Sequence, residues 1–106
     1  MQSTYLRLLP NSLGPDVQLW WIDLDAYVNT VAMDQSPASD RAEAARIVRV
    51  QDARRFLAIR HALRSIVGRV LARTPEDLIF QPDAFGKLRL MGENRLQLNL
   101  SHSGHQ

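Results

Sequence analysis

The feature that most constrains the fold of this chain is a long helical pattern between Gln51 and Ala72. Apolar residues recur there at steps of three and four, which places them on one face of a helix. Arginines lie largely off that face, so we expect an amphipathic helix with one buried side and one basic side. The apolar stripe consists of Phe56, Ile59, Leu63, Ile66 and Val70, widened by Val67 and Leu71, and the arginines are Arg54, Arg60, Arg64 and Arg69.

A strand is predicted before this helix, at Val17–Leu24, because the segment is short and rich in β-branched and aromatic residues. Its apolar residues lie on both faces, which is typical of an inner strand. Trp20 and Trp21 point to opposite faces of a regular strand, and we expect both to pack in the core. Residues 1–16 contain two prolines and a glycine and are predicted to form an irregular lead-in, which leaves 17–106 as the domain itself.

Shorter helices are predicted on either side of the long one. Residues 25–33 are expected to form a short helix. Ser36 is expected to cap a second helix over residues 37–48, since proline is tolerated at the first helical position. Thr74 is likewise expected to cap a single turn that begins at Pro75 and carries acids in its first positions.

Alternating residues predict a small sheet in the last third of the chain. The turn after Thr74 leads into Leu78–Phe80, and a loop at Gln81–Gly86 precedes a strand at Lys87–Leu90. A turn at Met91–Asn94 then precedes a strand at Leu96–Leu100 with its leucines on one face. The fold class expected is therefore α+β, with a small, partly antiparallel sheet packed on the long amphipathic helix.

Charge is distributed unevenly along the 106 residues. Residues 40–73 hold nine arginines against three acids, whereas the net charge of the whole chain is only +2. Arginine forms bidentate contacts with phosphate and carboxylate, so an anionic partner is one interpretation, and ordinary solvated helix faces are the other. The lack of cysteine excludes disulfides and thiolate chemistry. Without a secretory leader or a membrane-length apolar run, we expect a cytoplasmic protein with no membrane partner.

Two polar clusters are candidates for chemistry. Ser101 and His102 are adjacent on the last predicted strand and face opposite ways, so they do not form a nucleophile–base pair, and a hydrolase would also need a strained serine elbow. They can instead donate hydrogen bonds to a phosphate, or they simply close a strand. Phe85, Gly86 and Lys87 combine a stacking face, a close backbone approach and a positive charge suited to a nucleotide, with a glycine turn as the alternative.

The order and spacing of these segments resemble the signature region of Sfp-type 4'-phosphopantetheinyl transferases over residues 17–106. Members of this family move the phosphopantetheine arm of coenzyme A to a serine of an acyl or peptidyl carrier protein, with magnesium. The matching motifs are Ser36-Pro37, Arg41, Arg46, the helix segment 52–64, Pro75–Phe80, Gly86-Lys87, and Asn99 to Ser103.

The resemblance implies a fold and a set of site residues. The family fold is a pseudo-dimer of two similar α+β halves with coenzyme A between them, and this chain would be the first half. Leu88 follows Gly86-Lys87 where the family usually has proline, and Glu43 occupies a position that is often basic. By position, the coenzyme A site would take Arg41, Phe85, Gly86, Lys87, Asn99, Ser101 and His102, with the glycine–lysine loop against the adenine and the others near the phosphates.

Two family elements are absent from this sequence. The second half of the family carries Gly-x-Asp-x-Glu and Trp-x-x-Lys-Glu, which supply the magnesium ligands and the general base that phosphoryl transfer needs. We therefore expect no catalytic and no metal-binding residues in this chain, which would be truncated and inactive alone. A surface left by the missing half would favour self-association. The alternative from another class is a non-catalytic module that binds coenzyme A, a nucleotide or RNA.

Overall fold

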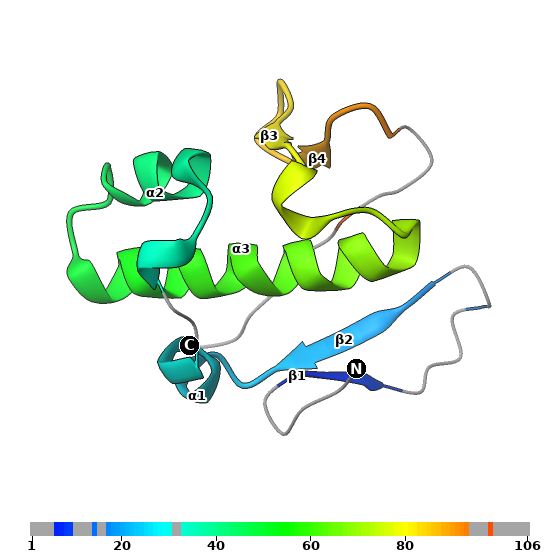
Figure 1. The fold of residues 1–106 in the computed structure, drawn as a ribbon, viewed down its shortest axis with the longest axis horizontal. Helices are drawn as coiled ribbons and strands as arrows, with labels where there is room; N and C mark the ends of the chain where they lie inside the picture. Colours follow the sequence, from blue (N-terminus) through cyan, green and yellow to red (C-terminus); the bar gives the residue numbers. More distant parts are fainter. Residues whose placement is uncertain (1–5, 10–13, 15–16, 31–32, 94–97, 99–106) are drawn as a thin grey trace. The chain divides into compact units, whose positions relative to one another are not determined.

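The computed structural model describes residues 6–9, 14, 17–30, 33–93 and 98. The described elements make an α+β chain with one long helix, α3 (Val50–Leu71), and two small antiparallel sheets (Figure 1). The chain divides into two compact units, Met1–Ala62 and Leu63–Gln106. The α+β class and the long helix are as predicted, but the described strands form two separate pairs rather than one sheet.

Helix α3 confirms the helix predicted from the apolar spacing, with each end within one residue of the expected position. Its C-terminus is closed by two backbone hydrogen bonds, from Arg73 N to Gly68 O at 2.9 Å and from Ala72 N to Arg69 O at 3.3 Å. Ala72 adopts a φ of 55°, the left-handed conformation that usually falls to glycine at this place. These bonds satisfy carbonyls that the end of a helix otherwise leaves unpaired.

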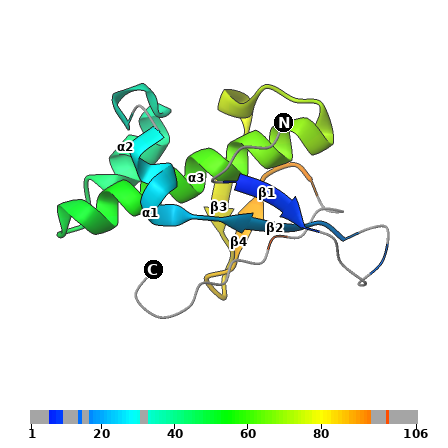
Figure 2. The ribbon, with the colours of Figure 1, turned by 90° about the horizontal axis from the view of Figure 1, so that it is seen from below.

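The first unit begins with a two-stranded antiparallel sheet, shown from a second direction in Figure 2. Strand β1 (Leu6–Leu9) pairs with β2 (Leu19–Ile22), with Leu6 opposite Ile22. The prediction of an irregular lead-in over residues 1–16 is therefore wrong for β1. A short strand is stabilised by the partner that receives its hydrogen bonds, and the turn residues that follow β1 gave no sign of that pairing.

Strand β2 differs from the inner strand that was predicted at Val17–Leu24. Within the described part of the chain it pairs with β1 alone, which leaves one long edge free. Trp21 is 39% exposed, and the Arg7 guanidinium lies 4.7 Å from its ring centroid. Trp20 is half-buried, and its indole N–H donates to Gln18 Oε1 at 2.9 Å. The expectation that both tryptophans sit in the core is wrong for Trp21, because a two-stranded sheet covers little of an aromatic face.

Short helices follow β2. Helix α1 (Leu24–Tyr27) starts at Asp23, whose carboxylate accepts the N–H of Ala26 at 3.2 Å. The single helix predicted over residues 25–33 is instead divided into α1 and two 3-10 turns, η1 (Val28–Thr30) and η2 (Met33–Gln35).

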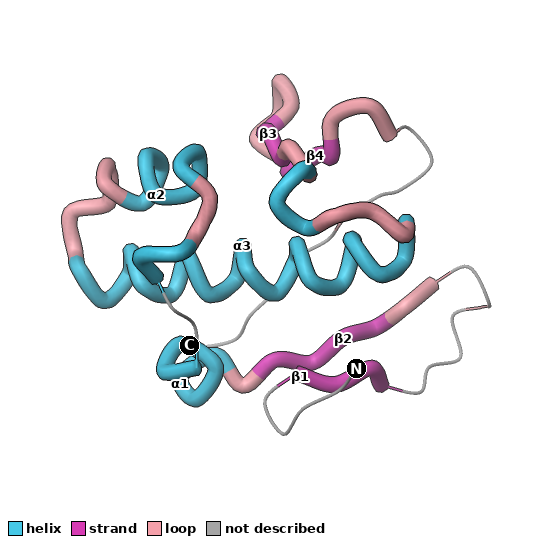
Figure 3. Tube along the Cα trace, viewed as in Figure 1, coloured by secondary structure: helices cyan, strands magenta, loops and turns pink. Residues whose placement is uncertain are grey.

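Helix α2 (Ala38–Ala44) is shorter than the predicted helix over 37–48 and is not capped by Ser36. Pro37 takes the cap position and offers no side-chain hydrogen bond, while the buried Ser36 hydroxyl finds no partner among the described residues. After Ala44 the chain leaves the helix in a turn that leads into α3, drawn as a loop in Figure 3.

The core of the first unit gathers apolar residues from β1, α1, α2 and the first part of α3. Two charged side chains, Asp40 and Arg60, are buried with them. The buried apolar residues are Leu6, Leu24, Tyr27, Ala44, Leu57, Ala58 and Ala62.

The second unit packs a hairpin and a 3-10 turn on the last part of α3. The turn η3 (Pro75–Asp77) starts after Thr74 as predicted, although the Thr74 side chain makes no capping hydrogen bond. Strand β3 (Phe80–Pro82) pairs antiparallel with β4 (Leu88–Leu90), so Gln81 and Pro82 are strand residues rather than the start of the predicted loop. The buried apolar residues of this unit are Leu63, Val67, Leu78, Phe80 and Leu90.

In the described ranges, no helix is both long enough and apolar enough to cross a membrane.

Candidate functional site

The tip of the β3–β4 hairpin is the best-defined candidate site, and a single carboxylate organises it. Asp83 Oδ1 accepts the backbone N–H of Phe85 at 2.8 Å and that of Lys87 at 3.0 Å, and Asp83 Oδ2 accepts Arg89 Nε at 3.0 Å. The backbone closes the same loop, because Asp83 N donates to Lys87 O at 2.8 Å and Gly86 N donates to Asp83 O at 3.0 Å. The tip is thus held by five hydrogen bonds that converge on one residue.

These contacts set the charge of the tip. The N–H of Phe85 first, and then the Arg89 guanidinium and the N–H of Lys87, hold the pKa of Asp83 below its ordinary value of 3.8. Each donor favours the ionised carboxylate. At neutral pH the loop is therefore held by an ionised Asp83 carboxylate.

Phe85 projects from this braced turn with 95% of its surface exposed. Gly86 beside it has a φ of +83°, and, apart from its two chain neighbours, no described residue has an atom within 4 Å of the place where a β-carbon would be. An aromatic face with open space and bare backbone next to it can stack on a planar ring and let that ring approach the main chain. Lys87 is half-buried.

Arg41, the fourth described residue of the predicted site, lies on α2 in the first unit. Its Nε donates to Ser36 O at 2.9 Å, and the side chain is exposed. Phe85, Gly86 and Lys87 belong to the second unit. The structure therefore brings these three residues together at the hairpin tip.

The remaining predicted site residues, Asn99, Ser101 and His102, lie outside the described residues. The same holds for the strand predicted at Leu96–Leu100, apart from Leu98, which is described outside any strand.

The basic face predicted for α3 is partly wrong, because Arg60 is buried. Its Nη1 lies 3.3 Å from Asp40 Oδ1 and 3.1 Å from Glu43 Oε1, and the exposed fractions of the Arg60 and Asp40 side chains are only 7% and 2%. The Arg60 guanidinium also lies 4.8 Å from the centroid of the Phe56 ring. This arginine ties α2 to α3 instead of facing a ligand.

Arg64 is buried as well, in the second unit. Its Nη1 donates to the carbonyls of Pro75 at 2.9 Å and Leu78 at 2.5 Å, and its guanidinium lies 5.5 Å from the Phe80 ring centroid. Because Arg55 is paired with Asp25 at 3.0 Å, three of the arginines of α3 serve the fold.

Two residues central to these arrangements were missed from sequence. Asp83 precedes Phe85-Gly86 at the spacing of an Asx turn, and that spacing is a signal that could have identified it. Asp40 lies in the first turn of a helix, where acids are common on solvated surfaces, so nothing local marks it as buried.

The resemblance implies magnesium, which needs carboxylate or other oxygen ligands held close together. Within the described ranges, no group of three His, Asp or Glu side chains is placed to hold a metal ion. No reaction step is assigned to a metal in this chain.

Comparisons with protein-family models, with curated proteins and with solved structures give no match to this chain.

Proposed function

We propose that this chain is the N-terminal portion of an Sfp-type 4'-phosphopantetheinyl transferase and that its β3–β4 hairpin binds the adenine end of coenzyme A. The observation that carries the proposal is the exposed ring of Phe85 on a tip braced by Asp83. The motif resemblance supports the choice of coenzyme A among nucleotides. The same proposal makes this α+β chain one half of the pseudo-dimer that is typical of the family.

The physical support for adenine binding comes from the shape of the tip. A planar base gains contact on the Phe85 face, while Gly86 leaves the backbone accessible to the edge of the base. Because Asp83 already fixes the backbone, little conformational entropy is lost when the ligand arrives. Burial of the exposed ring adds a hydrophobic contribution.

The role of this chain in the reaction would be to hold the nucleotide. Asn99, Ser101 and His102 are the proposed donors to the coenzyme A phosphates, where charge-assisted hydrogen bonds favour binding. The magnesium ligands and the general base belong to motifs that this sequence lacks. The chain would therefore bind coenzyme A without transferring its arm, and the acceptor in the complete reaction would be a carrier protein.

Calorimetry with coenzyme A and with adenosine 3',5'-bisphosphate tests the proposal. We expect both ligands to bind, and Phe85→Ala to weaken each by about tenfold, the loss of one base stack. Phe85→Tyr should retain the affinity. Met91→Ala, which also removes a partly exposed apolar side chain of this unit, is the matched control and should bind as the parent chain does.

Two results would count against the proposal. The absence of calorimetric binding of coenzyme A by the parent chain would exclude the nucleotide site. Equal binding by the parent chain and Phe85→Ala would exclude the hairpin as its location. A parallel assay of pantetheine transfer to an apo carrier protein, with magnesium, checks the expected lack of turnover; clear turnover would show that the chain has its own metal site and base.

A further inference from the structure

The beginning of α3 and the turn before it carry side chains that the described residues of the first unit leave exposed. Val48 is 96% exposed and Val50 is 75% exposed. Arg49 lies between them and is also exposed. Apolar side chains this exposed are common singly on protein surfaces, but two in three residues beside an arginine form a mixed apolar and cationic patch.

A small pocket adjoins this turn. It has a volume of about 230 Å³ and lies within the first unit, between α3 and the α1–η1 segment. Chain length places it near the valines, because Gln51 follows Val50 directly and three residues of chain span at most about 10 Å. The pocket is lined by Asp25, Val28, Asn29, Gln51, Arg54 and Arg55.

The charges of the pocket leave one cation available. Asp25 is the single acid among the described residues of the lining, and it is paired with Arg55 at 3.0 Å. Asn29 Nδ2 donates to the Asp25 carbonyl at 3.3 Å, which helps to hold α1 and η1 in place. Arg54 is exposed, and no acid contacts it within the described part of the chain. The described residues of the lining therefore carry one net positive charge, with the Arg54 guanidinium and the Gln51 amide as donors.

We propose that Val48, Arg49, Val50, Gln51 and Arg54 form a docking surface for an acidic segment of another protein, hereafter the valine–arginine surface. An acidic side chain of the partner would enter the pocket and accept hydrogen bonds from Arg54, while an apolar side chain beside it would cover the valines. This surface is independent of the hairpin and of the function proposed for it.

The size of the pocket favours a partner side chain over a free small molecule. Pockets that hold drug-sized ligands start at about 300 Å³, above the volume found here. A carboxylate on a short side chain needs much less space. A free anion in the pocket would leave the two valines exposed to water. A protein segment could place a carboxylate in the pocket and an apolar side chain over the valines.

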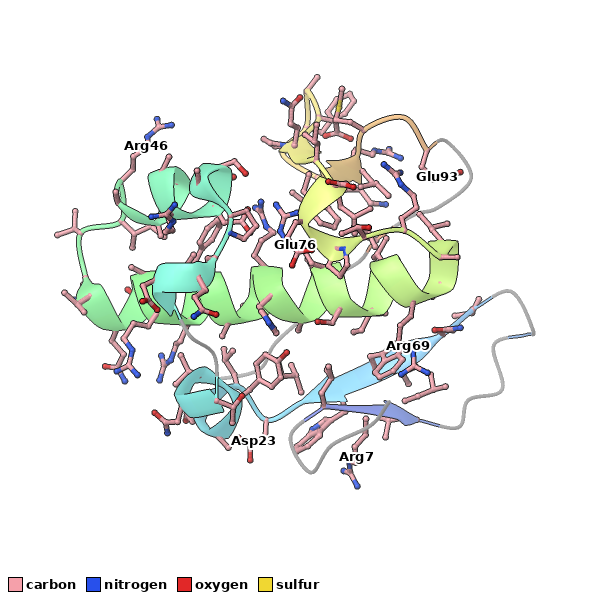
Figure 4. The ribbon with its side chains drawn as sticks, in the orientation of Figure 1. Arg7, Asp23, Arg46, Arg69, Glu76 and Glu93 are labelled. Carbon is pink, nitrogen blue, oxygen red and sulfur yellow. The ribbon has the colours of Figure 1, made fainter. Side chains whose placement is uncertain are left out.

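The composition of the surface also favours protein over nucleic acid or membrane. Single-stranded nucleic acid is usually held by aromatic rings between cations, and the valine–arginine surface contains no aromatic residue. Membrane-surface helices bury a broad face of Trp, Phe or Leu, whereas only two valines project here. Arg46, in the turn after α2, points away from α3 (Figure 4).

Fluorescence anisotropy with a short labelled peptide of glutamate and leucine tests the proposal. We expect binding that weakens as salt is raised, because the contact is partly electrostatic. Arg54→Gln should weaken binding about tenfold and Val48→Ser about threefold. Arg69→Gln, an exposed arginine of the second unit, is the matched control and should leave the affinity unchanged.

Competing ligands decide the class of partner. A peptide with glutamine in place of glutamate, phosphatidylserine vesicles and a single-stranded oligonucleotide are each titrated in the same way. We expect each to bind at least tenfold more weakly than the acidic peptide. The proposal is overturned if the acidic peptide does not bind, if Arg69→Gln weakens its binding as much as Arg54→Gln, or if vesicles or oligonucleotide bind as well as the acidic peptide.

Discussion

The guanidinium of Arg60 and the carboxylate of Asp40 meet at 3.3 Å inside the first unit, twenty residues apart in the chain and nearly sealed from water. Glu43, one helical turn after Asp40, approaches the same nitrogen at 3.1 Å but is 42% exposed. A buried charge is tolerated only when it is paired. The packing of α2 on α3 therefore depends on the Asp40 carboxylate that pairs with Arg60.

Asp40→Ala should lower the free energy of unfolding by about 3 kcal/mol, because it removes the buried carboxylate that pairs with the buried Arg60 guanidinium. Urea unfolding followed by circular dichroism measures this change. Glu43→Gln is the control, and its cost should stay below about 1 kcal/mol because that carboxylate is partly exposed. Similar costs for the two variants would show that the ion pair with Asp40 does not dominate the packing of α2 on α3.

Arg64→Met should destabilise the second unit by about 2 kcal/mol, since it keeps a long apolar stem but removes the donors to the carbonyls of Pro75 and Leu78. Arg64→Lys should recover part of the loss. Thermal unfolding compared with that of Arg69→Met, a change at an exposed arginine of the same helix, checks the prediction. If Arg64→Met unfolds at the same temperature as Arg69→Met, the buried contacts contribute nothing.

Ala72→Gly should raise stability by about 1 kcal/mol, because Ala72 holds a left-handed φ of 55° that costs an alanine about this much. Ala45→Gly is the matched control: Ala45 ends α2 with a right-handed φ of −63°, where glycine only adds disorder to the unfolded chain. Denaturant midpoints should move in opposite directions for the two variants, and movement in one direction would contradict the prediction.

Acid should loosen the hairpin tip. The pKa of Asp83 is lower in the folded chain than in the unfolded one, so its stabilising effect is complete above the ordinary value of 3.8 and is lost as the pH falls through the lower, folded value. Amide hydrogen exchange at Phe85 and Lys87 should accelerate in that acid range, after correction for the intrinsic dependence of exchange on pH.

Asp83→Asn provides the control for the acid effect. The amide oxygen can still accept one or both backbone N–H groups, but it does not titrate. Exchange in this variant should be faster at neutral pH and should show no added loss of protection in acid. An unchanged acid response in Asp83→Asn would assign the effect to another group.

The sequence predicted those elements that are determined by neighbouring residues, such as an amphipathic helix or a turn. The apolar spacing from Phe56 to Val70 identified α3 almost to the residue because helical periodicity needs no partner. Thr74 before Pro75 likewise marked the start of η3, and the glycine at Gly86 marked the hairpin turn.

Contacts with distant residues explain what the sequence did not predict. From the sequence, Arg60 and Arg64 were assigned to an exposed basic face. They are buried because Arg60 pairs with Asp40 and Arg64 donates to the carbonyls of Pro75 and Leu78. Trp21 looks like a core residue until β2 is found to pair only with β1 within the described ranges. At the hairpin, Phe85 was identified but Asp83 was not, although its spacing to Phe85 is the local signal of an Asx turn.

The exposed position of Phe85 also makes the hairpin tip a place to attach a reporter. Its ring takes almost no part in the packing of the second unit, while the backbone beneath it is held by Asp83. A photoreactive or fluorescent amino acid introduced at this position should leave folding intact. Such a probe would respond to the first molecule that reaches the tip, whether that molecule is a nucleotide or another protein.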